Sequence, residues 1–412
     1  DGGSLRVEGV DVRDWQRLLR RAPRLDKVEA SLLRSVDCPA DRFAEEVADL
    51  SRVSESVFDQ LAARLPDGKS FTAYPPELKN DTAELLVKCD RIIGHLDELQ
   101  EAAAGGGRDA NALQDDGRIA VWNGELTAFR DSLRWCCDTQ NYPEWAYWRE
   151  GGSLKSSCVN GSDLIPPAFD DDEIKVIALS ATMTVDRSFE YWANETGLAP
   201  DETAVLDSPF DLPSLMEIDV VDLGLQVMSP GYADAVARVC RKYARENGGA
   251  TLILLSSRRL LTAVSAYLKM NAEKDRLNIL VQGDLPRTEL LELFKENERS
   301  VLVGMASFRE GIDVPGEALT QVIIDRIPFP HPGDPVGEAR AKLEGRENFV
   351  KAVLPGAKMQ LRQAAGRLVR TGSDRGRVVI LDGRIVTRPD WKILDSLPAV
   401  PVKKYRLVGA HK

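Results

Sequence analysis

The chain has 412 residues, 43% of them hydrophobic and 29% charged, which is typical of a folded globular protein of two or three domains. No apolar run approaches the roughly 18 residues of a membrane span, and the first residues do not resemble a signal peptide. The six cysteines lack the spacing of metal ligands, so we expect structural thiols and no metal or iron–sulfur site in this chain.

The net charge of −11 is distributed unevenly. Residues 301–412 contain 19 Lys and Arg against 12 Asp and Glu, so this part carries +7 and the remainder −18. Such an asymmetry predicts a local anion-binding surface toward the C-terminal end.

The first 140 residues are dominated by helical periodicity. Apolar side chains recur at helical spacing in four runs: Trp15–Leu33, Phe43–Leu61, Leu85–Leu99 and Val121–Leu133. The glycine-rich stretch 105–117 predicts a loop between the last two. We therefore predict an all-helical region with antiparallel packing.

The pattern changes after residue 141. Tyr142–Trp148 predicts a strand with alternating aromatics, and Lys175–Leu179 predicts a buried strand. The clustered aromatics favour core packing over base stacking: Trp135, Tyr142, Trp145, Tyr147 and Trp148. Short apolar strands are then predicted at 251–255, 279–282, 301–303, 321–324 and 377–381, with helices at 232–246, 260–270 and 287–297. This alternation predicts an α/β fold with a doubly wound parallel sheet, in which ligands bind beyond the carboxyl ends of the strands.

The stretch Gln363–Arg370 is the most informative part of the chain. It reads Q-x-x-G-R-x-x-R, and a hydrophobic strand follows it. On a helix this spacing places the guanidinium groups of Arg367 and Arg370 on one face. Two planar guanidinium groups suit a polyanion such as a nucleotide triphosphate, although a lone R-x-x-R pair is more often a solvated helix face.

Further polar segments follow predicted strands, where a parallel sheet would bring them to one edge. They are 179–183 (L-S-A-T-M), 254–259 (L-L-S-S-R-R), 282–284 (Q-G-D) and 307–316 (S-F-R-E-G-I-D-V-P-G). Each alone is readily explained as a helix-capping turn. Their succession on one fold type predicts a functional edge.

In this order the segments resemble motifs III, IV, IVa, V and VI of the DinG and XPD group of superfamily 2 helicases, and DinG most closely. Phrases typical of that group are Leu206–Phe210, Leu280–Asp284 and Arg326–Pro330. The resemblance implies a helical arch-like domain over 1–140 and a C-terminal piece of motor domain 1 over 141–200. It also implies a RecA-like motor domain 2 over 201–412.

The resemblance also implies residue roles. Gln363, Arg367 and Arg370 would face the γ-phosphate, with Arg370 as the arginine finger. Nucleotide contacts and the link to the DNA groove are implied for Glu310, Gly311, Asp313 and Gly366, and coupling for Ser180, Ala181 and Thr182. Nucleic-acid contacts are implied for Ser256, Ser257, Arg258, Gln282, Ser307 and Arg309. Arg309 departs from the aromatic or small residue common there, and either adds a phosphate contact or marks a different DNA path.

The chain lacks a Walker A sequence and a Walker B acid pair. Gly68-Lys69-Ser70 fails the register, because Ala63 stands where the first glycine belongs, so we predict a loop. Asp170–Glu173 precedes a predicted strand where the acid pair should follow one. We therefore expect ATP and Mg²⁺ to bind only in a complete protein that contains the other half of motor domain 1. This chain alone would not hydrolyse ATP, and it carries no information on iron–sulfur ligands elsewhere.

The resemblance implies 5′-to-3′ movement on single-stranded DNA in the cytoplasm, at the nucleoid. Three alternatives stay open. The chain could be a non-enzymatic module that binds nucleic acid or a partner, or a motor directed at RNA or a DNA/RNA hybrid. The acidic arch-like region could also dock a protein partner, although a solvated helix bundle explains its charge equally well.

Overall fold

A computed structural model describes residues 7–25, 28, 33–34, 36–105, 116–162, 164–169, 175–305, 308, 314 and 316–407. The chain forms two compact units. Unit 1 contains Asp1–Ile165 and His331–Asn348, and unit 2 contains Pro166–Pro330 and Phe349–Lys412. Within the described residues, no helix combines the length and the apolar composition that crossing a membrane requires.

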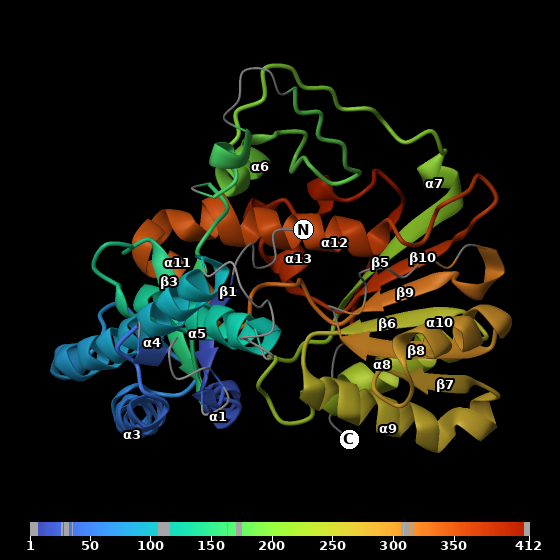
Figure 1. Cartoon of the computed structure of the whole chain (residues 1–412). Coiled ribbons are helices and arrows are strands. Elements are labelled where there is room, and N and C mark those ends of the chain that lie inside the picture. Colours follow the sequence, from blue (N-terminus) through green and yellow to red (C-terminus); the bar gives the residue numbers. More distant parts are fainter. Residues whose placement is uncertain are drawn as a thin grey trace. The chain divides into compact units, whose positions relative to one another are not determined.

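Unit 2 is built on a seven-stranded parallel sheet (Figure 1). Its strands, in chain order, are β5 (Met216–Asp222), β6 (Thr251–Leu255), β7 (Asn278–Val281), β8 (Ser300–Met305), β9 (Gln321–Ile324), β10 (Gly376–Ile380) and β11 (Val402–Arg406). The spatial order is β11-β5-β10-β9-β6-β8-β7, and every pairing is parallel. The predicted RecA-like doubly wound sheet is therefore confirmed. Sequence reasoning missed β5, where acidic residues interrupt the apolar pattern, and β11, an exposed edge strand with two lysines.

Helices cover both faces of this sheet. Helices α8 (Tyr232–Glu246) and α9 (Arg258–Asp275) pack on one face, and α10 (Arg287–Glu296) and α12 (Leu354–Ala365) pack on the other. Strand β10 contributes Val379 to the first core and Val378 and Ile380 to the second. Because the central strands are buried on both faces, they read as continuous apolar runs in the sequence. Shorter helices are α6 (Glu190–Thr196), α7 (Leu212–Leu215) and α13 (Arg384–Thr387).

Unit 1 is mainly helical, although the first 140 residues are not all-helical as predicted, because they also contain two short strands. Its helices are α1 (Val12–Arg20), α3 (Ala40–Arg64), α4 (Lys79–Gly105), α5 (Asp116–Cys137) and α11 (Pro335–Glu344). Helix α1 begins where the Asp11 carboxylate accepts hydrogen bonds from the backbone N–H groups of Arg13 and Asp14. The Trp15 ring stacks on Phe129 of α5 with centroids 3.7 Å apart, which ties α1 into the core. Most of the predicted 105–117 loop lies outside the described residues.

Unit 1 also contains a four-stranded antiparallel sheet with the order β1-β4-β3-β2. The strands are β1 (Val7–Asp11), β2 (Ser70–Phe71), β3 (Trp145–Glu150) and β4 (Ser153–Cys158). Here β3 is the predicted aromatic strand, while β1 and β2 add short strands to the helical region. Trp145, Tyr147 and Trp148 are buried, and Trp135 packs on Tyr142 and Trp145 with centroids 4.1 and 4.8 Å apart. Core packing of these aromatics is therefore confirmed.

Helix α11 packs against this small sheet, although the sequence places it between β9 and α12 of unit 2. Ala339 of α11 lies against Ala146 and Trp148 of β3. The Lys69 ammonium lies 3.0 Å from a Glu338 carboxylate oxygen, and Lys342 donates a hydrogen bond to Ser70 at 3.2 Å. Gly68 and Lys69 thus form a loop that leads into β2, whose first residue is Ser70, so the predicted loop covers the first two of the three residues.

The predicted buried strand Lys175–Leu179 is wrong. These residues are described without strand structure and are exposed, Ile177 to 83% and Leu179 to 89%. An apolar strand is buried only where a neighbouring strand pairs with its backbone, and no described strand lies beside this segment. Asp170–Glu173 lies outside the described residues.

Candidate functional site

Gln363 lies on α12, but Arg367 and Arg370 do not. The helix ends at Ala365 and Gly366 caps it. The next amides turn tightly, with the N–H of Arg367 donating to Ala364 and that of Leu368 to Ala365. The buried Leu368 side chain then enters the sheet core. The prediction of one helical face for both arginines is therefore wrong, because a turn presents them.

Asp374 holds this arginine turn in place. One carboxylate oxygen accepts hydrogen bonds from the backbone N–H groups of Arg370 and Thr371, both at 2.8 Å, and the other accepts from Gly316 at 3.2 Å. Burial of Asp374 is the largest influence and raises its pKa, but these N–H donors together hold the pKa below its usual value. Sequence reasoning missed this residue. The signal was the run Thr-Gly-Ser-Asp after Arg370, which is rich in turn formers.

The predicted coupling segment lies beside α12. The Gln363 side-chain amide donates a hydrogen bond to the Thr182 hydroxyl at 3.0 Å, and the Thr182 N–H donates to the Ser180 hydroxyl at 3.2 Å. Ala181 is exposed between them. The structure therefore brings together residues that are 181 positions apart in the sequence.

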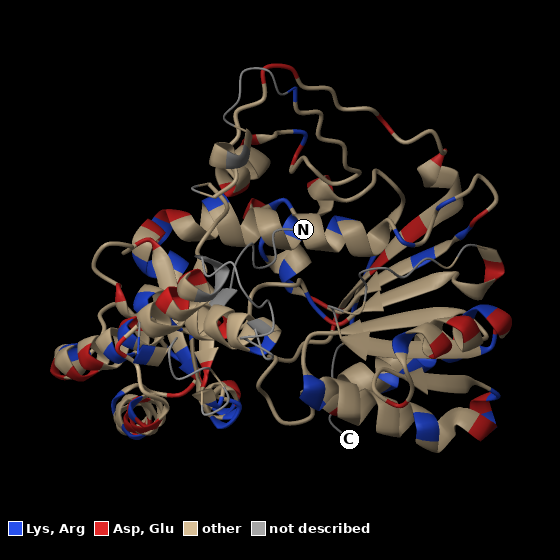
Figure 2. Ribbon diagram, viewed as in Figure 1, with Lys and Arg blue, Asp and Glu red and all other residues tan. Residues whose placement is uncertain are grey.

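A second group of predicted residues follows β6 and β7 at the carboxyl edge of the sheet. The Ser257 hydroxyl oxygen accepts a hydrogen bond from Leu260 N–H at 3.3 Å and caps α9. Arg258 is exposed in the first turn of that helix, where the ribbon is blue in Figure 2. The Gln282 side-chain oxygen accepts from Met305 N–H at 2.7 Å, which leaves the amide NH₂ as the donor group. The arginine turn instead precedes Gly376, at the amino end of β10, so the predicted residues form two groups.

Ser256 is held by an acid that sequence reasoning missed. Its hydroxyl donates a 2.5 Å hydrogen bond to Asp325, the residue directly after β9. Asp325 is only 2% exposed, and burial raises the pKa of this carboxyl to about 6. The hydroxyl proton of Ser256 is therefore used in the hydrogen bond to Asp325. In the sequence, Asp325 could have been recognised as an acidic residue that directly follows the apolar run of β9.

Asp325 makes stability depend on pH. Its folded pKa of about 6 exceeds the ordinary 3.8, so the stability it contributes is present below pH 3.8 and lost as the pH rises through 6. Asparagine carries no charge and still accepts from Ser256. We expect Asp325→Asn to raise the free energy of unfolding by about 1–3 kcal/mol near pH 8.

Urea unfolding of unit 2 from about pH 8 down to pH 5 measures this effect. The gain should shrink as the pH falls, while Asp395→Asn, at an exposed position, should show no such trend. A variant that is less stable than the wild type at every pH would contradict the assignment.

Five predicted site residues lie outside the described residues: Ser307, Arg309, Glu310, Gly311 and Asp313. Within the described chain, no group of three or more His, Cys, Asp or Glu side chains could hold a metal ion. The described residues therefore do not provide a cluster of Mg²⁺ ligands.

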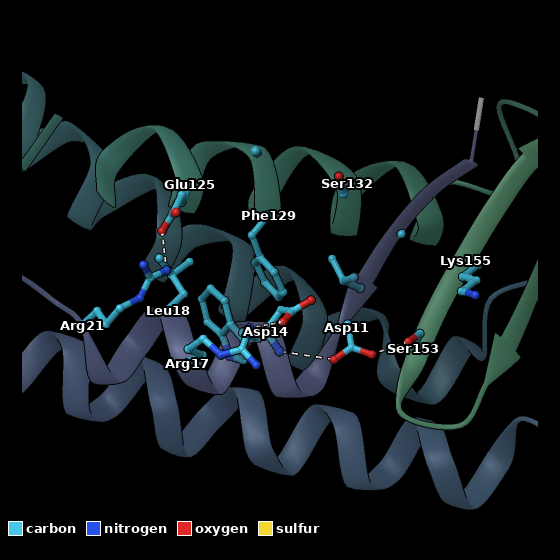
Figure 3. Close-up of a pocket in the computed structure, with 14 residues that line it drawn as sticks. Asp11, Asp14, Arg17, Leu18, Arg21, Glu125, Phe129, Ser132, Ser153 and Lys155 are labelled. Carbon is cyan, nitrogen blue, oxygen red and sulfur yellow. Dashed lines mark hydrogen bonds and ion pairs between the residues drawn. The ribbon is translucent and has the colours of Figure 1, made fainter. Parts of the chain in front are cut away.

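A cavity of about 590 Å³ in unit 1 is not this site (Figure 3). None of the predicted site residues line it. Two arginines that line it pair with carboxylates that also line it: Arg17 lies 3.0 Å from Asp14 and Arg21 lies 2.8 Å from Glu125. These carboxylates would compete with a triphosphate for the two arginines.

Comparisons with known proteins agree with the fold and the motifs. Residues 240–400 match the family model described as "Helicase C-terminal domain". The chain is 32% identical over 399 residues to "ATP-dependent DNA helicase YoaA" of Escherichia coli, covering 87% of this chain and 62% of that protein. It is 36% identical over 233 residues to "ATP-dependent DNA helicase DinG" of Photobacterium profundum, covering 54% and 34%.

A solved XPD helicase structure has the same fold, with a TM-score of 0.55 at 16% identity, covering 98% of this chain and 66% of that one. The chain thus spans less than two thirds of the length of the curated relatives named above. The motif order, the parallel sheet and these relatives lead to one conclusion. The chain is therefore similar to the DinG/YoaA and XPD-like group of superfamily 2, and the two curated relatives named above are ATP-dependent DNA helicases.

Proposed function

We propose that this chain works as part of an ATP-driven DNA helicase and supplies one wall of its nucleotide site and half of its DNA groove. The observation that carries the proposal is the pairing of Gln363 with Thr182 beside an arginine turn that Asp374 anchors. Such an arrangement fixes the Gln363 amide and the backbone of the turn that carries the two guanidinium groups. Groups fixed before the reaction stabilise developing charge without the cost of reorganising.

In this proposal Arg370 is the arginine finger, and Arg367, Gln363 and Gly366 face the γ-phosphate beside it. The guanidinium group would stabilise the charge that spreads over the transferred phosphoryl oxygens. Ser180, Ala181 and Thr182 would report the state of the nucleotide through the Thr182–Gln363 hydrogen bond. Glu310, Gly311 and Asp313 would continue this link toward the DNA.

The DNA-binding side of the proposal rests on the carboxyl edge of β6 and β7. Ser257, Arg258 and the N-terminus of α9 provide donors for phosphate oxygens, and Gln282 adds a side-chain amide. Asp325 would orient Ser256 in the same loop. Ser307 and Arg309 are assigned to this groove by the family resemblance. Contacts to the backbone alone are sequence-independent, as a motor that moves along single-stranded DNA requires.

ATP and Mg²⁺ would be held mainly by Walker A and Walker B residues, which this sequence does not contain. We therefore propose that the 412 residues bind DNA but do not turn over ATP without the other half of motor domain 1. We also propose 5′-to-3′ movement on single-stranded DNA and action at the nucleoid in the cytoplasm. Both follow from the family resemblance alone.

The test is ATP hydrolysis by this chain with and without single-stranded DNA, alongside binding of labelled DNA. We expect measurable DNA binding that weakens with added salt, and no turnover. DNA-stimulated turnover that disappears in Arg370→Ala would mean that this chain holds a complete triphosphate site, and would overturn the division proposed here. Binding of RNA or a DNA/RNA hybrid in preference to DNA would redirect the motor to those substrates.

One other outcome bears on the same proposal. If this chain binds DNA but a longer protein that contains it never hydrolyses ATP, a non-enzymatic binding module is favoured. The acidic surface of the arch-like region remains a proposed contact for a protein partner.

A further inference from the structure

The segment that follows Thr182 lies along one side of α12. Successive contacts join Thr182 to Gln363 at 3.0 Å, Thr184 to Arg362 at 3.4 Å and Asp186 to Lys358 at 2.6 Å. Farther on, the Tyr191 hydroxyl lies where a side chain on Gly356 would meet it at 3.0 Å. The partners on α12 are met in the order 363, 362, 358 and 356. Residues 182–191 therefore run antiparallel to the helix and stay in contact with it over about two turns.

The middle of this segment is an unusual turn. Asp186 and Arg187 have φ of 51° and 63°, and Val185 and Ser188 exchange backbone hydrogen bonds at 3.0 and 2.9 Å. Two left-handed residues between such a pair form a type I′ turn, which strongly favours Asn and Gly. A left-handed arginine is disfavoured by contact of its Cβ with the backbone. Other contacts must therefore hold this turn in shape.

Lys358 provides such a contact from the helix. Its side chain lies among the buried residues of α12, is 6% exposed, and ends 2.6 Å from the Asp186 carboxylate. An ammonium group that has left water needs a charged or hydrogen-bonding partner, whereas an apolar residue at the same position would not. The presence of lysine in this buried position is thus explained by the turn. Thr184 and Val185, between the turn and Thr182, are themselves buried.

We propose that Lys358 is a positioning residue that holds the Asp186–Arg187 turn against α12 and so keeps the Thr182 hydroxyl within reach of Gln363. Asp186 lies only four positions after Thr182, so the Lys358 contact limits how far Thr182 can slide along the helix. The coupling segment is thereby fixed to the helix that precedes the arginine turn. The link from the position of Thr182 along α12 to ATP hydrolysis rests on the function proposed above.

Amide hydrogen exchange in this chain tests whether Lys358 holds residues 182–186 against α12, and the measurement does not require ATP hydrolysis. We expect Lys358→Met to speed amide exchange in residues 180–190 about tenfold, because the turn loses its partner and opens more often. Lys295→Met makes the same change at an exposed position of α10 and should leave these amides unaffected. The amides of β6 should stay protected in both variants, which shows that the sheet is folded. Unchanged exchange over 180–190 in Lys358→Met would overturn the proposal.

Two further variants separate the ion pair from other effects. Lys358→Arg keeps a charged donor, and exchange should stay within about threefold of the wild type. Asparagine at position 186 suits the left-handed conformation but removes the charged partner of Lys358. Because that partner is lost, Asp186→Asn should speed exchange in the segment, and adding Lys358→Met should speed it little further. Full additivity of the two changes would contradict a direct pair.

In the complete protein, Lys358→Met should lower the DNA-stimulated kcat for ATP about tenfold with little change in KM, and Lys358→Arg should restore most of it. A kcat unchanged by Lys358→Met, in a protein that hydrolyses ATP, would overturn the role in coupling. If exchange responds to Lys358 as expected but the wild-type protein never hydrolyses ATP, the positioning role of Lys358 stands and the proposed function fails. The two proposals are therefore distinguishable.

Discussion

Replacing Arg370, the proposed arginine finger, with alanine in the complete protein is expected to lower DNA-stimulated ATP turnover by about 10³-fold or more. The expected loss is this large because an arginine finger acts on charge that develops only in the transition state. The Asp374 carboxylate fixes the Arg370 backbone through a 2.8 Å hydrogen bond, so the loss of the side chain cannot be offset by a shift of the turn. Steady-state hydrolysis at saturating single-stranded DNA measures the effect.

Arg375→Ala is the matched control for this experiment. It removes the same side chain five residues away, at an exposed position next to the same turn. Its turnover should stay within a few fold of the wild type. Arg370→Lys keeps the charge but loses the planar fork, so it should recover only part of the rate. Turnover within tenfold of the wild type in Arg370→Ala would remove Arg370 from the role of arginine finger.

The parallel sheet could be predicted from the sequence because its signal is local. Strands β6, β8 and β9 are four to six residues long, are buried on both faces and contain apolar runs of three or four residues. The positions of Ser257 and Gln282 then followed from the rule that polar segments after parallel strands meet at one edge. The arginine turn could not be predicted in this way. It depends on burial of Leu368 and on a carboxylate that reaches back from Asp374, and neither is visible in helical periodicity.

Errors and omissions elsewhere have a common cause in non-local pairing. Strand β1 pairs with β4 across more than 140 residues, and β2 pairs with β3 across more than 70, so neither short strand has a strong signal of its own. The contact of Lys69 with Glu338 joins positions 269 apart. Conversely, Lys175–Leu179 has the composition of a buried strand but no described neighbour to pair with. Local apolar composition therefore predicts the tendency to form a strand and not the presence of its partner.

Replacing Gly376 with alanine is expected to destabilise unit 2 by about 3 kcal/mol or more. A Cβ at this position would lie 2.1 Å from the carbonyl oxygen of Thr320 and 2.9 Å from a methyl group of Leu368. The same carbonyl accepts a hydrogen bond from Arg377 N–H at 2.9 Å, so it cannot move without weakening the pairing of β10 with β9. Calorimetric unfolding should show the transition of unit 2 lowered by roughly 6–12 °C.

Gly372→Ala is the matched control, because it adds the same methyl group in the same loop with nothing within 4 Å. It should be neutral or slightly stabilising, since alanine restricts the unfolded chain more than glycine does. Equal losses at both positions would mean that backbone freedom, and not close packing, explains the glycine at 376. If the packing explanation holds, Gly376 has two roles. It allows β10 to begin beside β9, and it leaves room for Leu368, whose burial directs the chain away from α12 and toward the position that Arg370 occupies.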